Sequence, residues 1–106
     1  MKNDMENLIV NLSLELALAI IRYAEKLEEQ KKFVVARQLL QSGTSIGANV
    51  REAQNAESRP DFIHKMKIAA KEADETEYWL TLCELSPNYP NPKSLKEKLN
   101  SVTNVL

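Results

Sequence analysis

The sequence predicts an all-α protein, an antiparallel up-down-up-down bundle of four helices in one domain over residues 1–106. Two observations carry this prediction. Apolar side chains recur at steps of three and four along most of the chain, which is the spacing of one helix face. No stretch alternates apolar and polar residues as a strand does, and the prolines stand only at positions 60, 87, 90 and 92.

The first helix is expected over residues 4–29. Asp4 is a suitable N-cap residue, and the charged segment EKLEEQKK at 25–32 is the expected site of a turn. Between them runs an apolar stripe that we expect to face the core, made up of Leu8, Leu12, Leu16, Ala19, Ile20, Tyr23 and Leu27.

The second helix is expected over residues 32–57 and holds both glycines of the chain, in the segment SGTSIGAN at 42–49. At about 100° per residue, Gly43 and Gly47 fall on the same arc as the apolar residues before and after them, which are Val35, Ala36, Leu39, Ile46, Val50 and Ala53. Because the apolar phase continues through the glycines, we expect one unbroken helix.

A glycine inside a helix costs about 1 kcal/mol relative to alanine, so a compensating contact is expected. We expect a neighbouring helix, or a bulky ring such as that of Trp79, to lie close to the backbone at Ser42, Gly43 and Gly47. Two alternatives are a helix break at the glycines and a phosphate-binding loop. The second alternative lacks a lysine after Gly47 and a strand before Gly43.

The third helix is expected over residues 60–84, with Ser58 as its cap and Pro60 in its first turn, where no N–H is needed. Its inner stripe is Phe62, Met66, Ala69, Ala73, Thr76, Leu80 and Cys83. The loop SPNYPNP at 86–92 leads to a fourth helix expected over residues 92–106, whose inner side carries Leu95, Leu99, Val102 and Leu106.

The first helix has a second apolar stripe on another side, made up of Val10, Leu14, Ala17, Leu18 and Ile21. In a four-helix bundle no helix is central, so a helix that is apolar on two sides favours contact with another chain. We therefore expect a homo-oligomer. The alternative is that the fourth helix and the long loop cover this stripe within one chain.

Charge along the third helix is ordered against the helix dipole. Residues 59–71 hold four basic residues and one acid, whereas residues 72–84 hold five acids and no base. One interpretation is head-to-tail contact, in which Glu72, Glu75 and Glu77 of one chain meet Lys65, Lys67 or Arg51 of the next. The other interpretation is that both groups of charges are simply solvated.

Composition favours no catalytic class. With 14 Lys and Arg against 15 Asp and Glu, the chain has no overall basic excess. His64 is expected in solvent and Cys83 in the core, so neither forms a nucleophile and base pair or a metal site. We expect no enzyme activity, no cofactor, no membrane segment and, since the first residues lack the features of a secretion signal, a cytoplasmic location.

The segment RQLLQSGTSIGANVREAQNAESRPDFIHKMKIAAKEADETEYWL at 37–80 resembles the 23S ribosomal RNA intervening-sequence proteins, also called S23-like ribosomal proteins. Members are four-helix bundles and are similar in fold to the accessory protein of diversity-generating retroelements. That protein is a pentameric ring that binds nucleic acid and associates with a reverse transcriptase. The resemblance therefore implies that this chain forms a ring, with a homopentamer as the expected assembly. The accessory protein is strongly basic, whereas this chain is not.

Together these points predict a non-enzymatic, ring-forming homo-oligomeric scaffold. RNA phosphates or an acidic, nucleic-acid-processing protein are its candidate partners. The basic residues that would hold such a partner are Arg37, Arg51, Arg59, Lys65, Lys67 and Lys71. The alternative is a protein-interaction adaptor that binds no nucleic acid.

Overall fold

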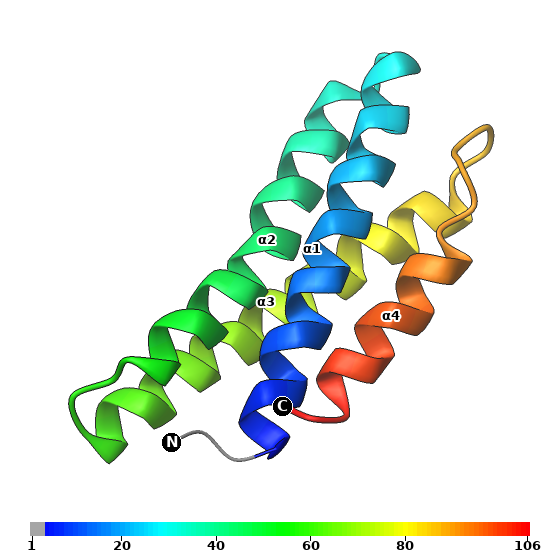
Figure 1. Ribbon diagram of the computed structural model, residues 1–106. Helices are drawn as coiled ribbons and strands as arrows, with labels where there is room; N and C mark the ends of the chain where they lie inside the picture. The colour runs from blue at the N-terminus through cyan, green and yellow to red at the C-terminus, as the bar shows by residue number, and fades with distance from the viewer. Residues whose placement is uncertain (1–3) are drawn as a thin grey trace.

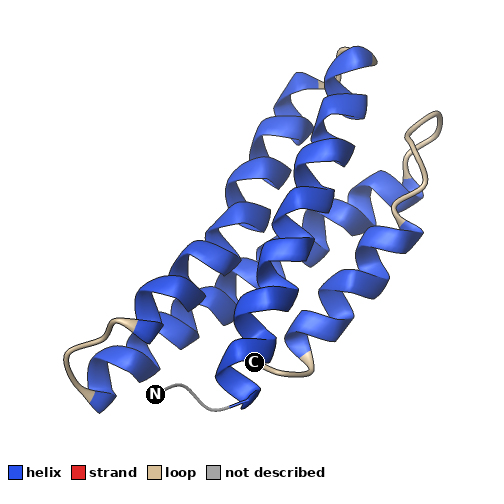
Figure 2. Ribbon diagram, viewed as in Figure 1, coloured by secondary structure: helices blue, strands red, loops and turns tan. Residues whose placement is uncertain are grey.

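The computed structural model describes the backbone of residues 4–106 and the side chains of residue 4 and residues 7–106. Its helices are α1 (Asp4–Glu29), α2 (Phe33–Gln54), α3 (Arg59–Leu85) and α4 (Lys93–Thr103). Figure 2 shows only helices and connecting loops over this part of the chain. The predicted all-α four-helix bundle is confirmed.

The helices occupy the four corners of an elongated bundle, 45 × 21 × 18 Å in extent (Figure 1). α1 packs against α2 and α4, and α3 also packs against α2 and α4. Within the described residues α1 makes no such contact with α3, so these two helices are diagonal partners. This arrangement gives the bundle four outer faces, one of which lies between α1 and α2.

Two helices end three residues earlier than the sequence predicts. α2 stops at Gln54 because the chain must reverse before Ser58, whose extended backbone caps α3 and whose Oγ accepts a hydrogen bond from the Asp61 N–H at 3.2 Å. α4 stops at Thr103, after which the N–H groups of Val105 and Leu106 bond back to the carbonyl of Val102. The C-terminal residues therefore fold onto the core instead of continuing the helix.

The core-facing stripe of α1 differs from the prediction at its N-terminal end. Leu8 is 43% exposed, whereas Ile9 and Ser13 are buried. From Leu16 onward the predicted residues are buried, and they include Ile20 and Leu27. Leu8 was misplaced because Leu8 and Ile9 are both apolar, and α1 begins with its core face shifted by one residue from the predicted line.

α2 is unbroken through its two glycines, and the helix that approaches them is α1. A Cβ atom at Gly43 would lie 2.8 Å from Ile20 Cγ1 and 2.9 Å from Ile20 Cγ2. At Gly47 it would lie 3.3 Å from the Ser13 carbonyl oxygen. These separations leave no room for a side chain at Gly43, so the absence of one is what lets α1 and α2 come this close.

The other two residues expected at this contact lie elsewhere. Trp79 does not fill the space beside the glycines, since the nearest atoms belong to Ile20 and Ser13. Its indole N–H instead donates to Glu75 Oε2 on α3, at 3.4 Å. Ser42 is buried against α3, where the Thr76 hydroxyl donates to Ser42 Oγ at 3.0 Å. The small residues of α2 therefore serve contacts on two sides, with α1 and with α3.

The loop between α3 and α4 is fastened to α1 by Tyr23. The Tyr23 hydroxyl donates a hydrogen bond to the carbonyl of Pro90, and its ring lies in the core. Burial raises the pKa of Tyr23, and the neighbouring Cys83 raises it further, so the phenol stays protonated and remains a donor.

We expect Tyr23→Phe to lower the free energy of unfolding by about 1 kcal/mol, the net value of a typical internal hydrogen bond. The ring and its packing are kept, so the loss isolates the hydroxyl. Chemical denaturation followed by circular dichroism measures the change. Tyr78→Phe is the matched control, because Tyr78 is 58% exposed. Equal stability of Tyr23→Phe and the control variant would contradict this role for Tyr23.

Residues Asn7–Glu29 of α1 are long and apolar enough, by length and composition alone, to cross a membrane. The core helix of a globular bundle meets the same test. In the structure Leu16, Ile20 and Leu27 of this stretch are fully covered by the other helices. α1 is therefore packed here as a bundle helix.

Candidate protein-interaction surface

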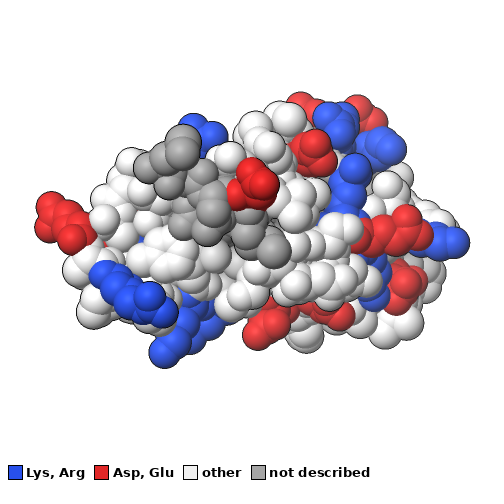
Figure 3. Space-filling model, turned by 60° about the horizontal axis from the view of Figure 1, so that its bottom comes forward, with Lys and Arg blue, Asp and Glu red and all other residues white. Residues whose placement is uncertain are grey.

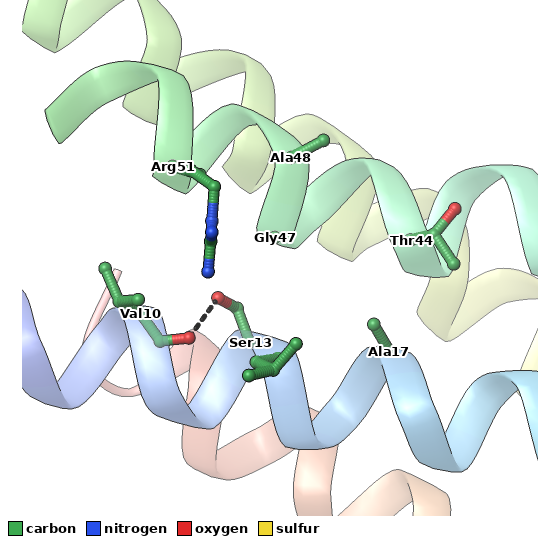
Figure 4. Close-up of a pocket in the computed structure, with 8 residues that line it drawn as sticks. Val10, Ser13, Ala17, Thr44, Gly47, Ala48 and Arg51 are labelled. Carbon is green, nitrogen blue, oxygen red and sulfur yellow. Dashed lines mark hydrogen bonds between the residues drawn. The ribbon is translucent and has the colours of Figure 1, made fainter. Parts of the chain in front are cut away.

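A groove runs along the outer face between α1 and α2. Beside the N-terminal half of α1 the groove forms a hollow of about 270 Å³. Figure 4 shows its walls, with α1 on one side and α2 on the other. The Arg51 side chain reaches from α2 into the groove toward α1, where Ser13 Oγ donates to the Val10 carbonyl at 3.1 Å. Lining residues are Val10, Ser13, Leu14, Ala17, Thr44, Gly47, Ala48 and Arg51.

A second hollow of about 230 Å³ lies in the same α1–α2 groove, nearer the turn that joins the two helices. It is lined by Ala24, Glu28, Phe33, Ala36, Arg37 and Leu40. Each hollow therefore combines apolar walls with one arginine, Arg51 in the first and Arg37 in the second.

Five large apolar side chains are exposed at or near these hollows. Leu14 lines the first hollow, and Phe33 and Leu40 line the second. Leu18 and Ile21 line neither hollow but follow Leu14 along α1 at steps of four and three. On α1, Leu14 is 48% exposed, Leu18 is 49% exposed and Ile21 is 39% exposed. On α2, Phe33 is 53% exposed and Leu40 is 38% exposed. We call these five residues, together with the two hollows, the α1–α2 face. A concentration of exposed apolar side chains on one face is typical of a surface that binds another protein.

The α1–α2 face is not covered within the chain. α4 packs on another side of α1, where a hollow between the two helices is lined by Ala19, Arg22, Tyr23, Lys26, Asn91, Ser94, Leu95 and Lys98. The alternative in which the fourth helix and the long loop cover the second apolar stripe is therefore wrong for this chain.

Pockets for small ligands usually exceed about 300 Å³ and enclose the ligand. Both hollows in the groove are smaller, so the face suits side chains of another protein better than a small molecule.

The acids of α3 that the sequence singled out differ in their exposure. Glu72 is partly buried, whereas Glu75 and Glu77 are exposed. Burial raises the pKa of Glu72, and the nearby charge of Glu75 raises it further. Ionised Glu72 is therefore less favourable in the folded protein than in the unfolded chain.

This shift in the pKa of Glu72 sets the pH dependence of its effect. Because the folded pKa is the higher one, the destabilisation is absent below the ordinary value of 4.5 and fully present above the folded value. We expect Glu72→Gln to raise the melting temperature at neutral pH and to leave it unchanged in acid. Thermal melts at several pH values, with Glu77→Gln as the exposed control, measure this difference. A gain for Glu72→Gln that is the same in acid and at neutral pH would contradict it.

The six basic residues proposed for phosphate or acidic partners are also spread over different places. Arg37 and Arg51 line the groove, and Lys65 pairs with Glu52 Oε1 at 3.4 Å. Arg59 and Lys67 are exposed on α3, as is Lys71. Figure 3 shows basic and acidic side chains interspersed on one face, with no broad area of one sign.

Neither candidate for nucleophilic or metal chemistry has suitable surroundings. Cys83 is buried in the core, and burial raises the pKa of its thiol, which disfavours the reactive thiolate. His64 is exposed on α3. Among the residues that the structure describes, no group of three His, Cys, Asp or Glu is placed to hold a metal ion.

Comparison with known proteins agrees with this architecture. The family model described as the 23S rRNA-intervening sequence protein matches residues 5–106. The chain belongs to this family. A similar solved structure is a protein of unknown function from the S23 ribosomal protein family of Bacteroides thetaiotaomicron. It is 46% identical, with a TM-score of 0.81 over 92% of this chain and 90% of that one. No curated protein matches the chain.

In this member of the 23S rRNA-intervening sequence protein family, the sequence identified only half of the groove. On the α1 side Val10, Leu14 and Ala17 were predicted, whereas Ser13, Ala24 and Glu28 were not. On the α2 side only Arg37, Arg51 and Gly47 had been singled out, and Gly47 only for close helix packing. The missed residues, Phe33, Leu40, Thr44 and Ala48, recur with those arginines at steps of three and four along α2. That spacing was the available signal, but Thr44 and Ala48 are not large apolar residues, so the stripe did not stand out.

Proposed function

We propose that the protein is a non-catalytic helical scaffold that associates with further copies of itself through the α1–α2 face. The observation that carries this proposal is the set of five exposed apolar side chains around an open groove. A monomer in water gains nothing from holding leucine, isoleucine and phenylalanine side chains on one face, whereas burial against another chain removes them from water.

The free energy gained by covering these side chains is comparable with the free-energy cost of association. Full burial of one such side chain contributes roughly 1.5–3 kcal/mol, and these side chains are about half exposed. Covering all five would contribute roughly 4–8 kcal/mol from one chain, which is of the order of the 4–15 kcal/mol that association costs in lost freedom. The covering surface of the second chain would add its own apolar area, so stable association is within reach.

Light scattering during size-exclusion chromatography tests the proposal. The expected result is a mass of several chains, each of 12.0 kDa. A mass of one chain at all protein concentrations tested would overturn it.

Binding of single-stranded RNA is a second candidate function. It is supported by the reference to 23S rRNA in the family's description and by Arg59, Lys67 and Lys71, which are exposed and form no ion pair within the described residues. If these residues neutralise phosphates, the logarithm of affinity should fall with the logarithm of salt at about −0.7 per phosphate.

Fluorescence anisotropy with a labelled single-stranded RNA tests this second function. We expect binding at about 50 mM salt that weakens steeply at about 200 mM, and we expect Lys67→Glu with Lys71→Glu to abolish it. No binding at the lower salt concentration would contradict the RNA function and favour an adaptor that binds proteins alone.

A further inference from the structure

We propose that the groove of one chain receives the outer side of α3 from a second chain. The residues that would enter the groove are Asp74, Glu75, Tyr78, Leu82 and Leu85, which we call the α3 strip. This inference rests on the proposed self-association and adds to it the identity of the second surface, and hence a head-to-tail arrangement of the chains.

The α3 strip has the composition of a docking surface. Glu75, Tyr78, Leu82 and Leu85 follow one another at steps of three and four, and Asp74 stands four residues before Tyr78, which places all five on one side of α3. Tyr78 is 58% exposed and Leu85 is 75% exposed, the largest exposed fraction among the large apolar side chains described. The Tyr78 ring packs edge-to-face on Trp79, with centroids 5.5 Å apart. Tyrosine on a protein surface commonly anchors a protein–protein contact.

Charge makes the α3 strip and the groove complementary. The groove carries Arg37 and Arg51, and neither forms an ion pair with another described residue. Of the five acids between residues 72 and 84, only Glu84 forms one, with Lys96 at 3.0 Å. Asp74 and Glu75 are adjacent on α3, so both remain available to the same one of the two arginines of a second chain. Opposite charges on facing surfaces select the partner and its orientation.

The lengths of the two surfaces also agree. At 1.5 Å per residue, Arg37 and Arg51 are about 21 Å apart along α2, and the α3 strip from Asp74 to Leu85 is about 16 Å long. The α3 strip can therefore lie along the groove within the span of the two arginines, with its acids near one of them and Tyr78 between the apolar walls.

A symmetric contact of groove with groove would satisfy these surfaces less well. Glu28 is the one acid that lines either hollow, so two facing grooves would bring four arginines together with two such acids. The same contact would leave Tyr78 and Leu85 exposed. Contact with the α3 strip instead covers both apolar surfaces and places two acids beside one of the two arginines.

A single chain cannot make this contact with itself. α3 is diagonal to α1 across the bundle, so the α3 strip and the groove lie on different sides of the molecule. Each chain therefore offers one groove and one α3 strip to two different neighbours. Such head-to-tail contacts close into a ring when the rotation permits and otherwise extend as a filament.

The test mixes two variants that each lack one surface. Leu14→Glu with Leu18→Glu removes the groove contact, and Tyr78→Arg with Glu75→Arg removes the α3 strip. All four positions are exposed, so circular dichroism should show an unchanged helical fold. Each variant alone should be a monomer by light scattering. An equimolar mixture should form a complex of two chains, since one intact groove and one intact α3 strip remain.

The other outcomes are distinct. If the Tyr78→Arg, Glu75→Arg variant assembles as the wild type does, or if the mixture stays monomeric while the wild type assembles, the α3 strip is not the occupant and this inference is overturned. If the wild type itself is a monomer, the proposed self-association fails, and this inference fails with it.

Discussion

Gly43→Leu is expected to lower the free energy of unfolding by about 3 kcal/mol or more. A Cβ atom alone would approach Ile20 Cγ1 and Cγ2 to less than 3 Å, and leucine adds three further carbon atoms to that contact. Ile20 is fully buried and cannot swing into solvent. Leucine is a much better helix former than glycine, so the loss would come from overpacking between α1 and α2 and not from helix propensity.

Thermal unfolding followed by circular dichroism measures this effect, which should lower the melting temperature by more than about 10 °C in a chain of this size. Gly47→Ala is the matched control. Its Cβ would lie 3.3 Å from the Ser13 carbonyl oxygen, a tight contact, while the gain in helix propensity is about 1 kcal/mol. The two effects nearly cancel, so we expect little change. A Gly43→Leu protein as stable as the Gly47→Ala protein would contradict the close approach of α1 at Gly43.

Leu14→Glu combined with Ile21→Glu is expected to disperse the assembly into single chains. Both side chains are exposed in one chain, so their replacement should not unfold it. In the assembly each carboxylate would enter an apolar contact and lose its hydration, at a cost of several kcal/mol. Self-association should weaken by at least about a thousandfold, since about 1.4 kcal/mol corresponds to a factor of ten.

Sedimentation velocity over a range of concentrations measures this loss. Leu8→Glu is the control, because Leu8 lies on the same helix but outside the α1–α2 face. Its exposed fraction, 43%, is close to the 48% of Leu14. We expect the control to keep the mass of the wild type. Retention of that mass by the double variant, or its loss in the control, would contradict the assignment of the face.

The fold was predictable because its main signals are local and periodic. The stripe from Leu16 to Leu27 fixed the core side of α1, and the unbroken apolar phase through Gly43 and Gly47 fixed α2 as one helix. Periodicity failed at Leu8 and Ile9, where both residues are apolar and either can face the core. It also failed at the ends of α2 and α4, which depend on how the chain reverses and returns to the core.

The candidate site was predictable only in part, since it lies between two helices. The exposed leucines of α1 could be recognised from one helix alone. Phe33 and Leu40 can be recognised as part of the surface only when α2 lies beside α1. The hollows lined by Arg37 and Arg51 likewise form only between the two helices. The separation of Lys65 from the other basic residues likewise follows from its contact with Glu52, on a different helix.

If chains associate through the α1–α2 face, the accessibility of this face in solution must fall as the protein concentration rises. A thiol introduced by Leu18→Cys, and in a second protein by Leu8→Cys, can be labelled with a maleimide while the native Cys83 stays buried. We expect the label to react at least about tenfold more slowly at position 18 as protein concentration rises, while position 8 keeps a constant rate. Equal rates at the two positions, independent of concentration, would contradict it.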